Sequence, residues 1–165
     1  MGKDKTVYHE ETYEGYAPHG IALLVETAND HPHRPVANVR MHFNKNSGSL
    51  GTSGSVSFMF NHMGEFKIKK ENMDIEELEF ELIDFGLEEI GEDSEGNIII
   101  RTPYNEFGNM SKALEEKKIN VITAELTWIP TNTLELSEED ANEVLKLVDN
   151  LDQDEDVQKV YHNLK

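Results

Sequence analysis

The sequence predicts an α+β protein built from two small α/β-sandwich modules, one inserted into the other. Short runs of alternating apolar residues, typical of strands, are interspersed with runs of helical period along the 165 residues. A strand-helix-strand-strand series within residues 1–70 lacks a second helix and a fourth strand, and residues 137–164 supply both. We therefore expect a split βαββαβ (ferredoxin-like) domain over 1–70 and 136–165, with an αββαβ domain inserted over 71–135.

The first part of the split domain is predicted from apolar spacing. Residues 20–27 alternate as a buried strand, and apolar residues at helical spacing predict a helix from Pro35 that ends near Gly48. Two further strands are expected over 55–60 and 66–69, with Gly64 breaking the chain between them. The side chains expected to face inward are Val36, Val39, Phe43, Val56, Phe58 and Phe60.

Capping residues and proline predict where the helices and strands after residue 70 begin and end. Asp74 with Glu77 resembles a capping box, Ser137 with Asp140 resembles another cap, and Pro130 stops a strand. In order, we expect a helix over 74–86, strands over 87–90 and 97–101, a helix around 107–114, a strand over 119–129, a helix over 137–151 and a strand over 157–164.

Charge divides the chain into two parts. With 15 basic and 33 acidic residues the net charge is −18, yet residues 1–70 carry eight basic and seven acidic residues, which leaves −19 on residues 71–165. An acidic surface repels nucleic acid and favours either solvent or basic protein partners. We expect a cytoplasmic protein with no membrane partner, because no apolar run approaches the length of a membrane span or of a secretory signal.

A cationic helix beside a glycine- and serine-rich segment is the candidate contact surface. Arg34, Arg40 and Lys45 lie on the predicted helix, and the segment 46–55 follows it. Glycines let the main chain come close to a partner, and hydroxyl groups can donate to phosphate. Two interpretations of the segment stay open, a mobile loop or a contact loop, and Arg40 can either reach solvent or pair with an acidic neighbour. The predicted open sheet faces carry serines and lysines, so base stacking on sheet aromatics is not expected.

Catalytic and metal sites are not expected. The segment 46–55 lacks the Lys-Ser/Thr ending of a phosphate-binding Walker loop, and zero cysteines exclude thiolate chemistry and disulfides. The histidines at 9, 19, 31 and 33 lack ligand spacing on a rigid element. The acidic pairs 76–77, 88–89 and 138–139 are expected to be solvated, so we expect no cofactor, no metal and no enzymatic activity.

Three segments resemble the YebC family, which includes bacterial probable transcriptional regulators and the mitochondrial translational activator of cytochrome c oxidase subunit I. They are Thr-Tyr-Glu-Gly-Tyr-Ala-Pro-His-Gly (12–20), Leu-Gly-Thr-Ser-Gly-Ser-Val (50–56) and Val-Gln-Lys-Val-Tyr-His-Asn (157–163). The resemblance implies three domains, and we expect this chain to lack the N-terminal basic helical one. Ala17, His19, Pro35 and Ser47 depart from residues usual in the family.

The resemblance implies a regulator of gene expression, and we expect a ribosome-associated translation factor that contacts RNA or the ribosome. The residues expected to make that contact are Tyr16, Arg34, Arg40, Lys45, Gly51, Thr52 and Ser53. Two alternatives stay open: a DNA-binding transcriptional regulator, and a protein-interaction module that binds basic proteins through residues 71–165. An acylphosphatase-type enzyme has only fold analogy and the positions of Arg34 and Asn38 in its favour.

Overall fold

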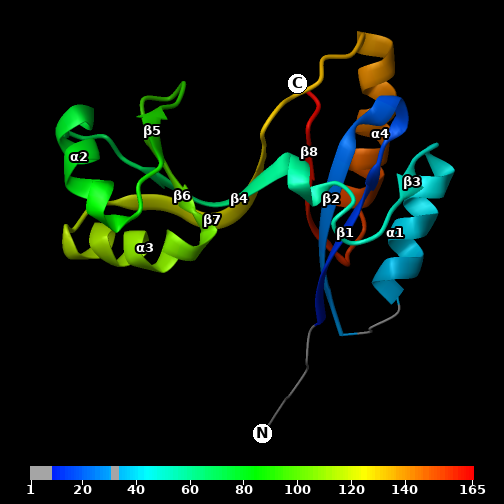
Figure 1. Cartoon of the computed structure of the whole chain (residues 1–165), viewed down its shortest axis with the longest axis horizontal. Coiled ribbons are helices and arrows are strands. Elements are labelled where there is room, and N and C mark those ends of the chain that lie inside the picture. The colour runs from blue at the N-terminus through cyan, green and yellow to red at the C-terminus, as the bar shows by residue number, and fades with distance from the viewer. Residues whose placement is uncertain (1–8, 31–33) are drawn as a thin grey trace, which may run out of the picture. The chain divides into compact units, whose positions relative to one another are not determined.

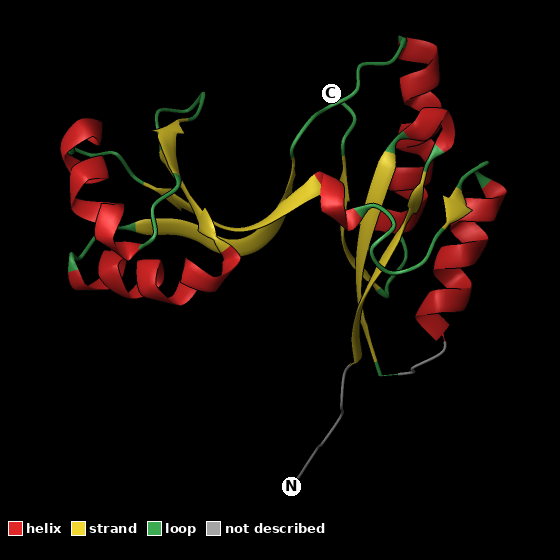
Figure 2. Ribbon diagram, viewed as in Figure 1, coloured by secondary structure: helices red, strands yellow, loops and turns green. Residues whose placement is uncertain are grey.

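The computed structural model describes residues 9–30 and 34–165, with the backbone alone at Arg34. Contacts divide the chain into an outer unit, residues 1–60 and 130–165, and an inserted unit, residues 61–129. Each unit contains a four-stranded sheet with helices (Figures 1 and 2). The predicted α+β class and the two α/β modules are confirmed.

The outer unit is an antiparallel sheet of strand order β3-β1-β2-β8 with two helices on one face. Its elements are β1 (His9–Tyr16), β2 (Ala22–Asn29), α1 (Arg34–Lys45), β3 (Ser49–Leu50), α4 (Glu138–Asp152) and β8 (Val157–His162). Buried residues of β2, α1 and α4, among them Leu23, Phe43 and Leu147, form its core. Figure 1 shows α1 and α4 on the same side of this sheet.

The inserted unit is a second antiparallel sheet, of strand order β5-β6-β4-β7. Its elements are β4 (Phe60–Ile68), α2 (Ile75–Leu82), β5 (Glu89–Glu92), β6 (Ile98–Pro103), α3 (Phe107–Glu116) and β7 (Val121–Pro130). Its own core is formed by residues such as Phe66, Leu82, Ile100 and Met110, so each unit has a separate apolar interior.

One strand lies in a different module from the predicted one. β4 pairs with β6 over six residue pairs, from Met63 opposite Pro103 to Ile68 opposite Ile98, so it completes the inserted unit. The βαββαβ order therefore belongs to the inserted unit, and the outer unit instead begins with the β1–β2 hairpin. The unit boundaries fall at 60/61 and 129/130, whereas the sequence suggested 70/71 and 135/136.

The predictions for residues 55–64 are wrong in two places. Residues 57–59 form the 3₁₀ turn η2 (Ser57–Met59), and Phe58 is 72 % exposed where alternation predicted an inward side chain. Gly64 does not break the chain, because it lies inside β4. A Cβ atom at Gly64 would come within 2.7 Å of the Phe107 ring and 2.8 Å of the Thr102 hydroxyl, so the glycine permits close packing.

The observed helices match the predicted ones more closely than the observed strands do. Asp74 caps α2 by accepting from Glu76 N, Ser137 caps α4 by accepting from Asp140 N, and Gly86 follows α2 and the 3₁₀ turn η3 (Ile83–Phe85) with φ of 91°. No helix in the described parts of the chain combines the length and apolar composition that crossing a membrane requires.

Candidate functional site

The candidate loop leaves the sheet at the β3 edge. β3 pairs with the end of β1, Tyr16 lying opposite Ser49 and Gly15 opposite Leu50, and Gly51 N then donates to Glu14 O at 2.7 Å. Tyr13 packs against the helix-covered core, so the alternation of β1 places Glu14 and Tyr16 on the opposite face. The chain therefore passes from the end of α1, around the sheet edge, to the face away from the helices.

A buried carboxylate fixes this loop. Glu14 is 5 % exposed, and its carboxylate accepts hydrogen bonds from Gly54 N at 2.7 Å, Val56 N at 2.9 Å and Ser57 N at 2.7 Å. Burial raises the pKa of Glu14, but these hydrogen bonds outweigh burial and hold the pKa below its ordinary value. The loop is thus attached to β1, and these three N–H groups are occupied by the chain's own carboxylate.

The rest of the loop projects side chains into solvent. Gly51, Thr52 and Ser53 are exposed, and Tyr16 is 36 % exposed at the end of the neighbouring strand. Phe58, next to the Ser57 amide that Glu14 holds, adds an exposed aromatic ring. Phe58 was not among the predicted contact residues, because strand alternation placed its ring in the core.

The three predicted cations do not form one compact cluster. Arg40 and Lys45 are exposed and make no ion pair with any described residue, so of the two alternatives left open for Arg40 the structure shows the one in which it reaches solvent. At 3.6 residues per turn they lie about 140° apart around α1. The backbone of Arg34 opens α1 about 16 Å from Lys45, and its side chain lies outside the described residues. Lys45 is the cation nearest in sequence to the β3 edge.

Acidic residues near the C-terminus bind α1, a role that sequence analysis did not assign. His42 Nε2 lies 2.9 Å from a carboxylate oxygen of Asp154. Asp156 is 2 % exposed, and its carboxylate accepts from the side-chain amides of Asn29 and Asn38. Part of the acidic 152–156 stretch therefore fixes the helix that carries the candidate cations.

The inserted unit contains an aromatic stack that sequence analysis also missed. The His62 ring lies between Trp128, with centroids 4.1 Å apart, and Tyr104, with centroids 4.6 Å apart. The planes are inclined by 3° and 15°. The three residues are distant in sequence, so no local motif signals the stack.

His19 belongs to the set of potential metal ligands found among the described residues. Its Nε2 atom lies 2.6 Å from a carboxylate oxygen of Glu143 and 3.4 Å from one of Asp140. The hydrogen bond to Glu143 raises the pKa of His19, which favours an imidazolium ion pair and disfavours metal ligation. His9 is exposed, and His31 and His33 lie outside the described residues.

Comparison with known proteins assigns the family. The family model described as "TACO1/YebC second and third domain" matches residues 8–164. The chain belongs to the YebC family. A "Probable transcriptional regulatory protein" of Myxococcus xanthus is 54 % identical to this YebC-family chain over 167 aligned positions, which cover 99 % of the chain and 70 % of that relative.

Other relatives agree with this assignment. A Flavobacterium johnsoniae protein of the same description is 48 % identical, over 99 % of this chain and 68 % of its own length. A crystal structure of a conserved hypothetical protein from Aquifex aeolicus superposes with a TM-score of 0.80 at 34 % identity and covers 98 % of this chain and 67 % of that one. The predicted YebC membership is confirmed.

Proposed function

We propose that this YebC-family protein regulates gene expression at the level of translation, by binding RNA or the ribosome without catalysing a reaction. The names of its relatives support a regulator of gene expression. The choice of RNA over duplex DNA is supported by charge, because a net −18 opposes a continuous phosphate surface, whereas RNA can be bound through shape and a few local contacts.

The loop held by Glu14 is the observation that carries this proposal. Three main-chain hydrogen bonds to one buried carboxylate fix the backbone that presents Thr52 and Ser53. A loop that is ordered before binding loses less conformational entropy when it binds. Exposed Phe58 supplies an aromatic face on which an unpaired base can stack.

The cations of α1 complete the proposed surface. Lys45 precedes β3 by four positions and stays unpaired among the described residues, so it can meet a phosphate near the loop. Arg40 projects from another side of the helix and would contact a different part of the same partner. Arg34 and Tyr16 remain members of the proposed surface.

Co-sedimentation with ribosomes tests this proposal. Arg40→Glu/Lys45→Glu and, separately, Phe58→Ser should reduce the bound fraction severalfold, because each removes phosphate or base contacts. Lys112→Glu/Lys146→Glu makes the same charge change at two exposed lysines outside the surface and should bind as the unmodified chain does. Equal loss in both double variants, or no loss in either, would remove the loop surface from the proposal.

A DNA-binding transcriptional regulator is the second candidate, favoured by the wording of the relatives' names. A gel-shift competition between RNA and duplex DNA for the unmodified chain separates the two candidates. Retention of labelled single-stranded RNA against excess duplex DNA supports the translational role. Preferential displacement by duplex DNA supports the transcriptional one.

A further inference from the structure

The first helix of the inserted unit lies in a segment that contains no positive charge. Residues 71–100 hold twelve Asp or Glu and no Lys or Arg. On the hairpin several carboxylates are paired with cations: Glu92 with Lys70 at 2.6 Å, Asp93 with Lys67 at 3.5 Å and Glu89 with Arg101 at 3.2 Å. Around α2 they are not. The acidic residues there that pair with no described cation are Glu71, Asp74, Glu76, Glu77, Glu79, Glu81 and Asp84.

Two large apolar side chains are exposed among these carboxylates. Phe80 is 80 % exposed and Ile83 57 % exposed, whereas Leu78 and Leu82 are buried against the sheet. Residues three apart on a helix are neighbours, so Phe80 and Ile83 form one apolar patch where α2 meets η3. Solvent contact with so large a ring is unfavourable, and such patches within a charged rim are typical of protein-binding surfaces.

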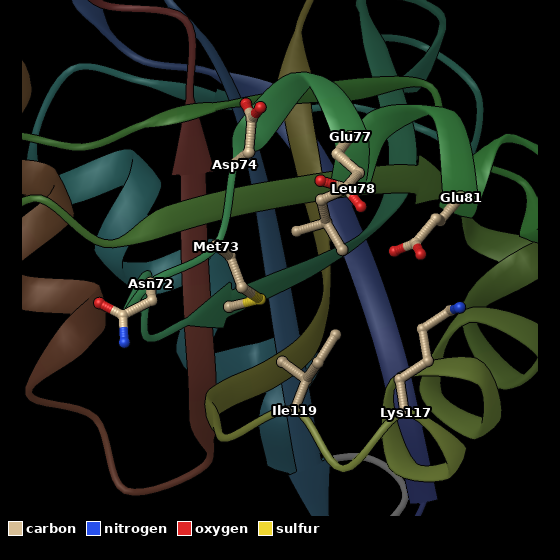
Figure 3. Close-up of a pocket in the computed structure, with 8 residues that line it drawn as sticks. All are labelled: Asn72, Met73, Asp74, Glu77, Leu78, Glu81, Lys117 and Ile119. Atoms are coloured by element: carbon tan, nitrogen blue, oxygen red, sulfur yellow. The ribbon is translucent and has the colours of Figure 1, made fainter.

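A cavity of about 490 Å³ lies beside α2, and Glu77 on its rim is three residues before Phe80, so the cavity adjoins the apolar patch. Figure 3 shows Leu78 and Ile119 pointing toward one another across it, with Met73 to one side of them, so its floor is apolar. Its α2 rim carries Asp74, Glu77 and Glu81, and the opposite rim carries Lys117. The Asp74 carboxylate caps α2 and points away from the floor, so the carboxylates next to it are those of Glu77 and Glu81. An apolar floor beside two carboxylates suits a side chain with an apolar stem and a cationic end.

We propose that this α2 surface, defined as the cavity rim and floor together with Phe80 and Ile83, docks a segment of another protein in which Lys or Arg alternates with apolar residues. Charge complementarity selects this partner, because the inserted unit carries seven basic and 17 acidic residues, a net charge of −10. A second copy of the chain would bring its own −18, and nucleic acid is repelled by the same field. The inference is independent of the proposed function, which uses residues of the outer unit.

Fluorescence anisotropy with defined peptides tests the docking surface. The probe is a fluorescein-labelled peptide that repeats Lys-Leu. One control peptide replaces each Leu by Ser and keeps the charge, and a second replaces each Lys by Glu and keeps the apolar residues. The full chain should bind the probe and bind both controls much more weakly, because the surface offers both charge and apolar contact. Equal binding of the Lys-Ser peptide, or no binding of the probe, would overturn the proposal.

Matched variants of the protein locate the contact. Glu77→Gln/Glu81→Gln should weaken binding of the probe about tenfold, as expected for the loss of two solvent-exposed ion pairs. Glu115→Gln/Glu116→Gln removes the same charge from exposed positions of α3 and should change binding less than about twofold. Phe80→Ser should weaken binding without unfolding the unit, because the ring is outside the core.

Two outcomes would contradict the assigned partner. If both double variants lose the same affinity, the attraction is diffuse and α2 is not a docking surface. If single-stranded RNA, added without the peptide, shifts the NMR signals of residues 72–83 and 117–119, the same surface takes nucleic acid, and the basic-protein assignment is wrong. NMR chemical-shift changes confined to residues 72–83 and 117–119 on addition of the probe would support it.

Discussion

At the residue scale, Glu14 is the side chain on which the candidate site depends. A carboxylate that is 5 % exposed is costly to bury unless donors replace the lost water. Three backbone N–H groups do so, and hydrogen bonds to an ionised acceptor are stronger than those between neutral groups. The loop conformation is therefore stabilised by Glu14 of β1, which lies 40 positions before Gly54 in the sequence.

Replacing Glu14 by Gln should lower the free energy of unfolding by about 3 kcal/mol, because the amide group of Gln turns donors toward backbone N–H groups that need acceptors. Urea denaturation followed by circular dichroism measures the change. Glu10→Gln, an exposed position on the same face of β1, should shift the free energy by less than about 0.5 kcal/mol. A Glu14→Gln protein as stable as the Glu10→Gln protein would mean that the carboxylate does not hold the loop.

Lowering the pH should remove the stabilisation that the Glu14 carboxylate provides. The folded-state pKa of Glu14 lies below its ordinary value of 4.5, so the stabilisation is fully present above that value and is lost as the pH falls through the folded-state pKa. The stability difference between the unmodified chain and Glu14→Gln should therefore shrink as the pH is lowered below 4.5. A difference that stays constant with pH would show that protonation of Glu14 is not the cause.

Gly64 allows a residue-scale test of packing in the inserted unit. Gly64→Ala should cost about 1–3 kcal/mol, because the new Cβ would meet Phe107 and Thr102 at less than 3 Å. Gly91→Ala is the matched control, since Gly91 is also in a strand and a Cβ there meets nothing within 4 Å. Thermal unfolding of the two variants separates the steric cost from the general effect of replacing a strand glycine.

At the element scale, the sequence predicted helices well because their signals are local. The caps at Asp74 and Ser137 and the glycine at 86 act within a few residues of the helix ends that they mark. Strand β1 was not predicted, because it contains three glutamates. One of them, Glu14, is buried only because it accepts hydrogen bonds from a loop far along the chain. Strand membership depends on distant pairing partners, as β4 shows.

The candidate site was predictable in composition but not in arrangement. The glycine- and hydroxyl-rich segment and the cations of α1 are visible in the sequence. Their separation around the helix follows from its periodicity, but the exposure of Phe58 depends on a 3₁₀ turn that alternation conceals. The His62 stack joins three residues from separate elements, so only the folded sheet brings them together.

The pKa values of two histidines in the outer unit, His19 and His162, should be shifted in opposite directions by their surroundings. His19 lies in the 3₁₀ turn η1 (Pro18–Gly20), and its hydrogen bond to Glu143 raises its pKa above 6.5. Burial lowers the pKa of His162 below 6.5. The stabilisation from His19 is therefore complete below 6.5 and is lost as the pH rises through its raised pKa. Titration followed by NMR should give the two midpoints on opposite sides of 6.5.

Variants on α4 check the assignment of the His19 shift. Glu143→Gln should lower the His19 midpoint, because it removes the charged hydrogen-bond acceptor. Glu138→Gln removes an equal charge from the first turn of α4, about 140° around the helix from Glu143, and should leave the midpoint nearly unchanged. Equal shifts in both variants would mean that the general negative field, and not the contact, raises the pKa of His19.

At the scale of the whole molecule, the chain forms two separate hydrophobic cores. Phe43 lies in the core of the outer unit and Leu82 in that of the inserted unit, and the two cores share no residue. Both units carry net negative charge, −8 and −10, so neither neutralises the other. The division of proposed roles, RNA or ribosome contact in the outer unit and basic-protein contact in the inserted one, follows these separate structures.

Separate cores predict separate responses to core substitutions. Phe43→Ala should destabilise the outer unit by about 3–5 kcal/mol, and Leu82→Ala should destabilise the inserted unit by about 2–5 kcal/mol, because each leaves a cavity at a fully buried position. The single tryptophan, Trp128, stacks on His62 inside the inserted unit, so its fluorescence reports that unit. Amide hydrogen exchange of residues 23–25 in β2 reports the outer unit. Leu82→Ala should shift the fluorescence transition and leave exchange in β2 nearly unchanged, and Phe43→Ala should do the reverse; if either variant moves both signals equally, the units unfold as one cooperative body.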